Sequence, residues 1–219
     1  EYPLNVNNIS VFREWAQIKS IYANDIQTAK AMLEDAIYKQ RIPPKEKAIL
    51  KIDLGDILRL DGNEWDATLL YSQVEKDFPN DTIGHYAKYK NAKLSFFLGE
   101  FDWAEAQLNV LRAATSKLIA NDAMYLSMLI FDNQNEDSIN PALMYYAKAD
   151  FMLESNRLTE ADLYLDSIHL FALFHSLSDD ILFKKAEIAI KRQDYQGADS
   201  LLNILTQNYR YELLADDAL

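Results

Sequence analysis

Residues 54–79 read LGDILRLDGNEWDATLLYSQVEKDFP, and this stretch decides the fold. Gly62 stands where the chain must turn sharply, and Ala67 follows it by five positions. Tyr71 and Val74 come four and seven positions after the alanine, so they lie on the same face of a helix as Ala67. The stretch therefore predicts two helices joined by a tight turn, with a small residue where the helices approach closely.

The same pattern recurs in four other places. In each copy an Asn, Gly or Gln precedes an alanine by five positions, and apolar residues follow the alanine at plus four and plus seven. The five alanines are Ala29, Ala67, Ala104, Ala161 and Ala198, which are spaced by 38, 37, 57 and 37 residues. A fixed period of this size indicates a stack of helix pairs, because one short pair cannot bury its apolar face alone. The long interval predicts one inserted helix, in the apolar stretch 118–131.

Composition favours an all-α fold. The chain of 219 residues has only five glycines and five prolines, and it lacks the alternation of a strand. The expected helices lie at about 9–23, 25–40, 45–61, 63–77, 82–98, 101–114, 118–131, 139–155, 158–174, 178–192 and 194–209. We expect one elongated repeat domain over 9–212, after an irregular segment at 1–8. Residues 213–219 are expected to begin a further, truncated helix of a longer protein.

The best copy of the pattern resembles a known family. Leu54 and Gly55 in the first helix, Ala67 and Tyr71 in the second, and Pro79 after it are similar to the tetratricopeptide repeat. This resemblance implies a right-handed α-α superhelix of antiparallel helix pairs. It also implies a concave face, lined by the first helix of each pair, that binds an extended peptide or a helix of another protein.

Charge and residue types exclude several functions. The formal net charge is −12, which disfavours binding to nucleic acids and to anionic membranes. Cysteine is absent, so thiolate catalysis, disulfides and cysteine-ligated zinc are excluded. The three histidines form no helical zinc motif, and no nucleophile or phosphate-loop motif is present. We therefore expect no enzymatic activity, no cofactor and no metal.

The resemblance also implies candidate binding residues on the first helix of each pair. Corresponding positions, four residues apart, hold these residues: Ile52 and Asp56, Tyr89 and Lys93, Tyr146 and Asp150, Phe183 and Glu187. Chaperone-binding members of the family carry Lys and Asn at such sites, whereas this chain has apolar or aromatic residues followed by mostly acidic ones. A groove of this kind suits a basic or amphipathic segment. The alternative is that these aromatic residues pack between the repeats.

A closer resemblance concerns GEFDWAEAQLNVLRAATSKLIANDAMYLSMLIFDN (99–133) and YAKADFMLESNRLTEADLYLDSI (146–168). Both segments are similar to tetratricopeptide-repeat proteins of Bacteroidetes that resemble cell-envelope scaffolds. The resemblance implies a periplasmic or outer-membrane-associated location, with the cytoplasm as the alternative. The leading hypothesis is a non-catalytic scaffold that binds another protein during assembly of an envelope complex. The alternative is an accessory or regulatory domain of a larger enzyme or signalling protein. Self-association through the C-terminal end is a third hypothesis.

Overall fold

The computed structural model describes residues 4, 8–112, 116–134, 141–168, 176–212 and 214–219. Within these residues every regular element is helical and no strand occurs, so the prediction of an all-α fold is confirmed. The elements are α1 (Ile9–Gln17), the π-helix η1 (Ile18–Tyr22), α2 (Ile26–Lys39), α3 (Pro44–Leu60), α4 (Glu64–Asp77), α5 (Thr82–Phe97), α6 (Phe101–Leu111), α7 (Lys117–Asn133), α8 (Pro141–Glu154), α9 (Leu158–Ile168), α10 (Ser178–Lys191) and α11 (Tyr195–Asn208).

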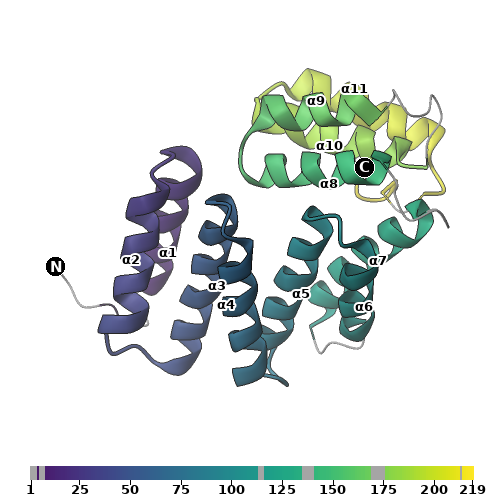
Figure 1. Cartoon of the computed structure of the whole chain (residues 1–219). Coiled ribbons are helices and arrows are strands. Elements are labelled where there is room, and N and C mark those ends of the chain that lie inside the picture. Colours follow the sequence, from purple (N-terminus) through teal and green to yellow (C-terminus); the bar gives the residue numbers. More distant parts are fainter. Residues whose placement is uncertain (1–3, 5–7, 113–115, 135–140, 169–175, 213) are drawn as a thin grey trace. The chain divides into compact units, whose positions relative to one another are not determined.

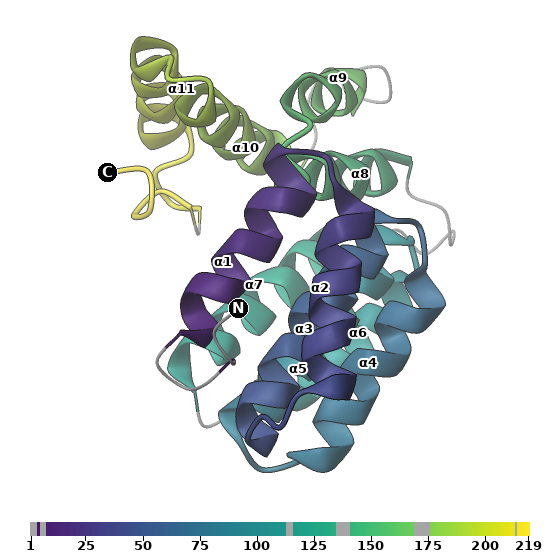
Figure 2. The same ribbon diagram turned by 90° about the vertical axis from the view of Figure 1, so that its left-hand side faces the viewer.

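The chain forms two compact units. The first comprises residues 1–96 and 102–127, and the second comprises residues 97–101 and 128–219. In the first unit α1 and α2 form a pair that packs on α3, and α3 pairs with α4. Figures 1 and 2 show these helices side by side, with the chain reversing direction from each helix to the next. In the second unit α8 pairs with α9 and α10 with α11, and α10 also packs on α8 and α9. The fold is therefore a helical repeat of antiparallel pairs.

Each predicted turn contains a residue with left-handed backbone geometry. The positive φ angles of the described residues belong to the five predicted turn residues: Asn24 (51°), Gly62 (78°), Gly99 (79°), Asn156 (58°) and Gln193 (63°). Such a residue ends a helix because it redirects the chain while the following N–H groups still reach the last carbonyls. The hydrogen bond from the N–H of Asn63 to the carbonyl of Leu58, at 2.8 Å, is one example.

The predicted alanines lie in the buried interior of the helix pairs. All five are buried, and none has more than 3% of its surface exposed. In the second pair a glycine has the same role, because a Cβ on Gly55 would lie 2.5 Å from the ring of Tyr71. The small size of the residues at these points lets the two helices of a pair approach closely, as the repeat pattern predicts.

The inserted helix is α7, which lies in the sequence between the pairs α5/α6 and α8/α9. Ser127 on α7 accepts a hydrogen bond from Arg112 at 3.1 Å and donates one to Asn109 on α6 at 3.4 Å. A helix in the 57-residue interval is therefore confirmed, and it extends slightly further at both ends than the predicted 118–131.

The structure differs from the predicted elements in two places. The first helix does not continue as an α-helix to residue 23, because its last turn widens into η1, where the N–H of Ala23 bonds to the carbonyl of Ile18 at 2.9 Å. A further helix was predicted to begin at 213–219, whereas residues 214–218 form turns, in which Leu214, Ala215 and Ala218 are buried. The predicted end of the helix at 158–174 lies partly outside the described residues.

Candidate functional site

The predicted acid Asp56 is held between helices of the first unit. It lies on α3, and its carboxylate accepts a hydrogen bond from the hydroxyl of Tyr71 on α4 at 2.7 Å. The ammonium group of Lys90 on α5 donates to the other carboxylate oxygen at 2.9 Å. A side chain that the sequence suggests as a partner-binding acid therefore connects one helix pair to the next.

A more deeply buried ion pair lies one helical turn away on α3. Asp53 has 4% of its side chain exposed and accepts hydrogen bonds from Arg13 on α1 at 2.5 and 3.0 Å. Burial raises the pKa of Asp53 above its ordinary value, although the hydrogen bond and charge of Arg13 act in the opposite direction. The pair ties α1 to α3, and it was not among the residues that the sequence singled out.

The other predicted residues of the first unit are Tyr89 and Lys93 on α5, and both side chains are partly exposed. The charge of Lys93 acts on Asp122 of α7, whose pKa is raised by burial and lowered to a smaller extent by this lysine. Tyr89 and Lys93 therefore lie where a bound segment could still contact them.

In the second unit the predicted residues have two different environments. Tyr146 on α8 is 2% exposed and is one of the largest fully buried side chains, so its ring belongs to the core of the unit. Asp150 on the same helix pairs with Lys184 on α10 at 3.0 Å, and Lys184 also pairs with Glu187 at 2.8 Å. Phe183 is partly exposed. Of these residues, the structure brings Asp150 and Glu187 together through a shared lysine.

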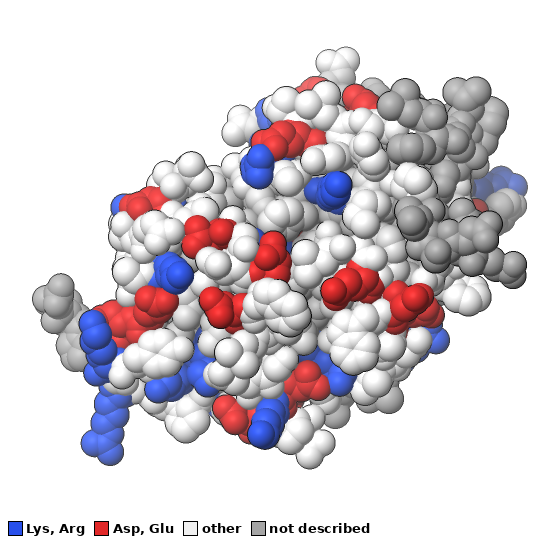
Figure 3. Space-filling view, in the orientation of Figure 1, with Lys and Arg blue, Asp and Glu red and all other residues white. Residues whose placement is uncertain are grey.

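The two inter-pair contacts follow one rule. Asp56 and Lys90 are 34 residues apart, and Lys184 likewise follows Asp150 by 34 positions. In both units an acid on the first helix of one pair therefore meets a lysine on the first helix of the next pair. Figure 3 shows acidic and basic side chains interspersed on the face in view. Much of the negative charge that the sequence assigns to a binding groove is thus balanced within the repeat array.

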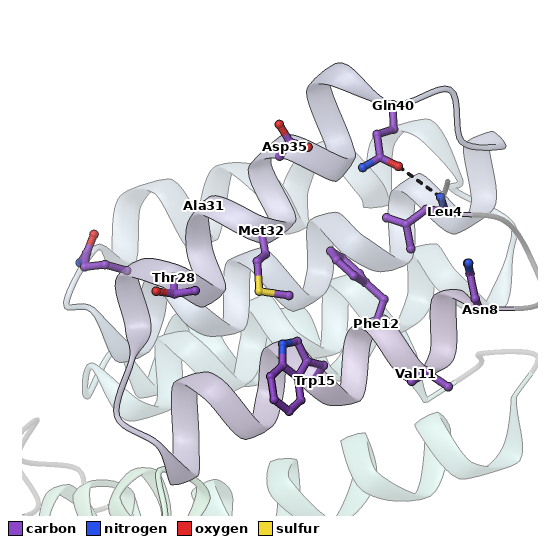
Figure 4. Close-up of a pocket in the computed structure, with 11 residues that line it drawn as sticks. Leu4, Asn8, Val11, Phe12, Trp15, Thr28, Ala31, Met32, Asp35 and Gln40 are labelled. Carbon is purple, nitrogen blue, oxygen red and sulfur yellow. Dashed lines mark hydrogen bonds between the residues drawn. The ribbon is translucent and has the colours of Figure 1, made fainter. Parts of the chain in front are cut away.

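A groove on the first unit offers a surface of a different kind. It has a volume of about 1010 Å³ and lies along α1 and α2. Its lining residues are Leu4, Asn8, Val11, Phe12, Trp15, Gln27, Thr28, Ala31, Met32, Asp35 and Gln40. Figure 4 shows Phe12, Trp15 and Met32 converging in the middle of the groove, with Thr28 near one end and Gln40 near the other. Only one lining residue, Asp35, carries a charge, and it pairs with Lys39 at 2.9 Å.

An exposed apolar stripe continues from this groove. Val11, Trp15, Ile18 and Tyr22 occupy successive turns of α1 and η1, and each is 47% to 68% exposed. Lys19 lies over the Trp15 ring, with its ammonium 5.6 Å from the ring centre. Scattered exposed apolar residues are normal, whereas a contiguous line of them beside a hollow is a candidate interaction surface.

The sequence contains a signal for this surface. Ala16, on another face of α1, is buried, while Val11, Trp15, Ile18 and Tyr22 repeat at the spacing of a second stripe. A helix that packs on one side needs one apolar stripe, and the described residues leave the second stripe exposed. The repeat pattern does not predict this surface, because the motif residues of the first copy lie in α2 and not in α1.

The remaining features of the described residues do not indicate a catalytic or metal-binding site. A second hollow, of about 500 Å³, contains the ion pair of Glu75 and Lys88 at 2.8 Å, with His85 also in its wall. No group of three or more His, Asp or Glu that could hold a metal ion occurs in the described part of the chain. In the same residues, no helix combines the length and apolar character needed to cross a membrane.

No family model and no curated protein matches this chain. Solved structures of nearly identical TPR-like repeats, from a protein assigned as a kinesin light chain in Podosopora anserina, are similar to it. One of them, with a TM-score of 0.44, is 13% identical and covers 94% of this chain and 98% of its own. Its Q17M variant, with a TM-score of 0.43, is also 13% identical and covers 93% and 97%. These scores are too low to support an inference about function, so the description of the fold depends on the helix pairs themselves.

Proposed function

We propose that this chain is a non-catalytic scaffold that binds another protein, and that its first unit provides the main contact surface. The observation that carries the proposal is the groove of α1 and α2 together with the exposed stripe beside it. Aromatic residues at the centre of an interface typically contribute most of the binding energy. Trp15 belongs to both the groove and the stripe, so it is the expected anchor.

The alternative surface, formed by the first helices of the pairs, has fewer side chains available to contact a partner. Asp56 and Asp150 are engaged by lysines, and Tyr146 lies in the core. Tyr89, Lys93, Phe183 and Glu187 are at least partly exposed and can add contacts. We therefore assign them a secondary role in this proposal.

Capture of a partner by the purified protein, with matched tryptophan variants, tests the proposal. Trp15→Ala removes the expected anchor, whereas Trp65→Ala removes a tryptophan that is 88% exposed on α4, away from the groove. Loss of an aromatic anchor costs about 2 kcal/mol or more, which weakens binding roughly 30-fold. If Trp15→Ala and Trp65→Ala capture the same partner equally well, the first unit does not bind through this surface.

A periplasmic or outer-membrane-associated location, and a role in assembly of an envelope complex, are also part of this proposal. Their support is the resemblance of residues 99–133 and 146–168 to envelope-associated repeat proteins. Fractionation of cells that produce the native protein, followed by detection with an antibody, tests the location. Recovery of the protein only in the cytoplasmic fraction would exclude the envelope role and leave the binding surface unaffected.

A further inference from the structure

We propose that the groove of α1 and α2 holds an amphipathic α-helix of a partner protein, placed where the second helix of a preceding pair would lie. This inference rests on the proposed function, because it specifies what the first unit binds.

The position follows from how the pairs stack. Within the first unit, α2 is the second helix of its pair and packs on α3, the first helix of the next pair. The groove lies on the other side of the same pair, because its lining comes from α1, α2 and the residues that flank them, and from no later helix. A helix in the groove would therefore contact α1 as α2 contacts α3, so it would continue an interface that the array already uses.

The faces of α2 support this placement. Its buried residues, Ala29, Leu33, Ala36 and Ile37, pack in the core of the unit. The residues that line the groove lie on a different face of the helix: Gln27, Thr28, Ala31, Met32 and Asp35. Each set gathers on one face of the helix, because its members recur at one, three or four residues, as packing against a helical neighbour requires.

The chemistry of the lining favours a helix over an extended peptide. The middle of the groove is apolar, formed by Val11, Phe12, Trp15, Ala31 and Met32, and polar lining residues lie mostly toward its ends. An extended peptide would press its unpaired N–H and C=O groups against this apolar middle, which is costly. A helix bonds these groups internally and presents only side chains.

The size of the groove also favours a helix over a small molecule. The volume of about 1010 Å³ is at the upper limit of small-molecule sites, which span roughly 300–1,000 Å³. The lining on α2 and at its C-terminal end runs from Gln27 to Gln40, a length of about 20 Å at 1.5 Å per residue. An occupant of about 14 residues, the length of α2 itself, would fill the groove.

The net charge of the protein indicates which residues the bound helix carries on its solvent side. The protein carries a net charge of −12, whereas the groove lining has a single charged residue. The matching helix therefore has an apolar stripe toward the groove and Lys or Arg along its solvent side, where they steer encounter with the acidic protein.

A single-tryptophan protein tests the inference directly. Trp65→Phe and Trp103→Phe leave Trp15 as the only indole, and both replaced residues are exposed. The probe is a capped peptide of about 14 residues made of Leu, Gln and Lys, with leucines at the i, i+4, i+7, i+11 spacing of one helical face. We expect saturable binding with a blue shift of Trp15 emission, because the peptide removes water from the ring.

Two matched controls define the site and the conformation. Ala31→Lys places a charge in the groove at an exposed position, and Ala106→Lys places the same charge at an exposed position on α6. We expect at least a ten-fold loss of peptide affinity for Ala31→Lys and none for Ala106→Lys. The same peptide with a central proline, which breaks its helix, should bind at least ten-fold more weakly.

The outcomes separate the two proposals. Equal binding of the proline peptide, or no binding of the helical peptide, overturns the helix inference. If capture of the native partner still depends on Trp15 in that case, the proposed function stands with a different kind of occupant. Equal peptide binding by Ala31→Lys and the parent protein shows that the peptide binds elsewhere, which also overturns the inference.

Discussion

At the scale of the residue, the turns carry the strongest signal, because left-handed backbone geometry favours only a few residue types. Gly62 and Gly99 adopt positive φ without steric cost, and Asn24 and Asn156 tolerate it. Gln193 has the same geometry, with φ of 63°, but its Cβ gives it no such tolerance. The last turn of the array is therefore more strained than the others.

Replacement of Gln193 by glycine should relieve this strain. Its side chain is exposed, so little contact is lost, and we expect Gln193→Gly to raise the free energy of unfolding by about 1 kcal/mol. The control is Gln196→Gly, in the first turn of α11, which should lower stability because glycine weakens a helix. Urea unfolding of both variants measures the difference. A lower midpoint for Gln193→Gly would show that the side chain makes a contribution of its own.

The buried alanines give a second prediction at this scale. Ala104 is fully buried on α6, whereas Ala106 on the same helix is exposed. Ala104→Leu should destabilise the protein by roughly 1–3 kcal/mol through overpacking. Ala106→Leu should change stability little. Equal urea midpoints for the two variants would mean that α6 can move away from its neighbours at no cost.

At the scale of the element, ion pairs between successive first helices complement the apolar core. Lys184 on α10 is 17% exposed and contacts Asp150 on α8, whose side chain is 9% exposed. Its neighbour Lys185 contacts Asp166, which is much more exposed. Two adjacent lysines on one helix therefore pair with acids that are buried to very different extents.

Lys184→Met should consequently cost more than Lys185→Met. Removal of one member of a buried pair leaves the other charge poorly solvated, and we expect a loss of about 2 kcal/mol or more for Lys184→Met. The exposed pair of Lys185 is worth less than about 1 kcal/mol. Thermal unfolding of the two variants gives the comparison. Similar losses would indicate that the α8–α10 contact depends on apolar packing alone.

The link between α1 and α3 predicts a dependence on pH. Because burial raises the pKa of Asp53, the folded protein binds more protons than the unfolded chain between pH 3.8 and the native pKa. The contribution of Asp53 to stability is therefore fully present below pH 3.8 and is lost as the pH rises through the native pKa. The stability of the parent protein relative to Asp53→Asn, measured by urea unfolding, should fall over this range. A rise instead would mean that pairing with Arg13 outweighs burial.

At the scale of the whole molecule, stability depends on helix packing within two compact units. The described residues contain no cluster that could hold a structural metal ion. We therefore expect that EDTA leaves the thermal midpoint unchanged, because a structural metal would contribute folding free energy directly. Calorimetry with and without the chelator measures this, and a lower midpoint in EDTA would reveal a metal site.

The sequence predicts the pairs and turns well for a physical reason. Both depend on local rules. A glycine such as Gly62 indicates left-handed backbone geometry, and an alanine such as Ala67 indicates a buried position between helices. The widening of α1 into η1 was not predicted, because no residue type marks it. Local patterns therefore give the fold, with small errors at the ends of elements.

The candidate site is harder to predict, because it depends on the offset between neighbouring helices. Asp56 can be placed on the first helix of its pair, but its contact with Lys90 depends on how far α5 is shifted along α3. The same applies to Tyr146, which shares the repeat position of Tyr89 yet is buried while Tyr89 is partly exposed. The groove of α1 and α2 is lined by residues outside the repeat motif, so the motif does not predict it.

The spacing of the inter-pair contacts has an evolutionary consequence. Asp56 with Lys90, and Asp150 with Lys184, join positions that are 34 residues apart. A mutation that reverses the charge of one member creates a like-charge contact between successive first helices, so selection should favour a compensating mutation in the other. Related chains should therefore show paired substitutions at this separation. In contrast, the exposed stripe that includes Trp15 should diverge among relatives that bind different partners.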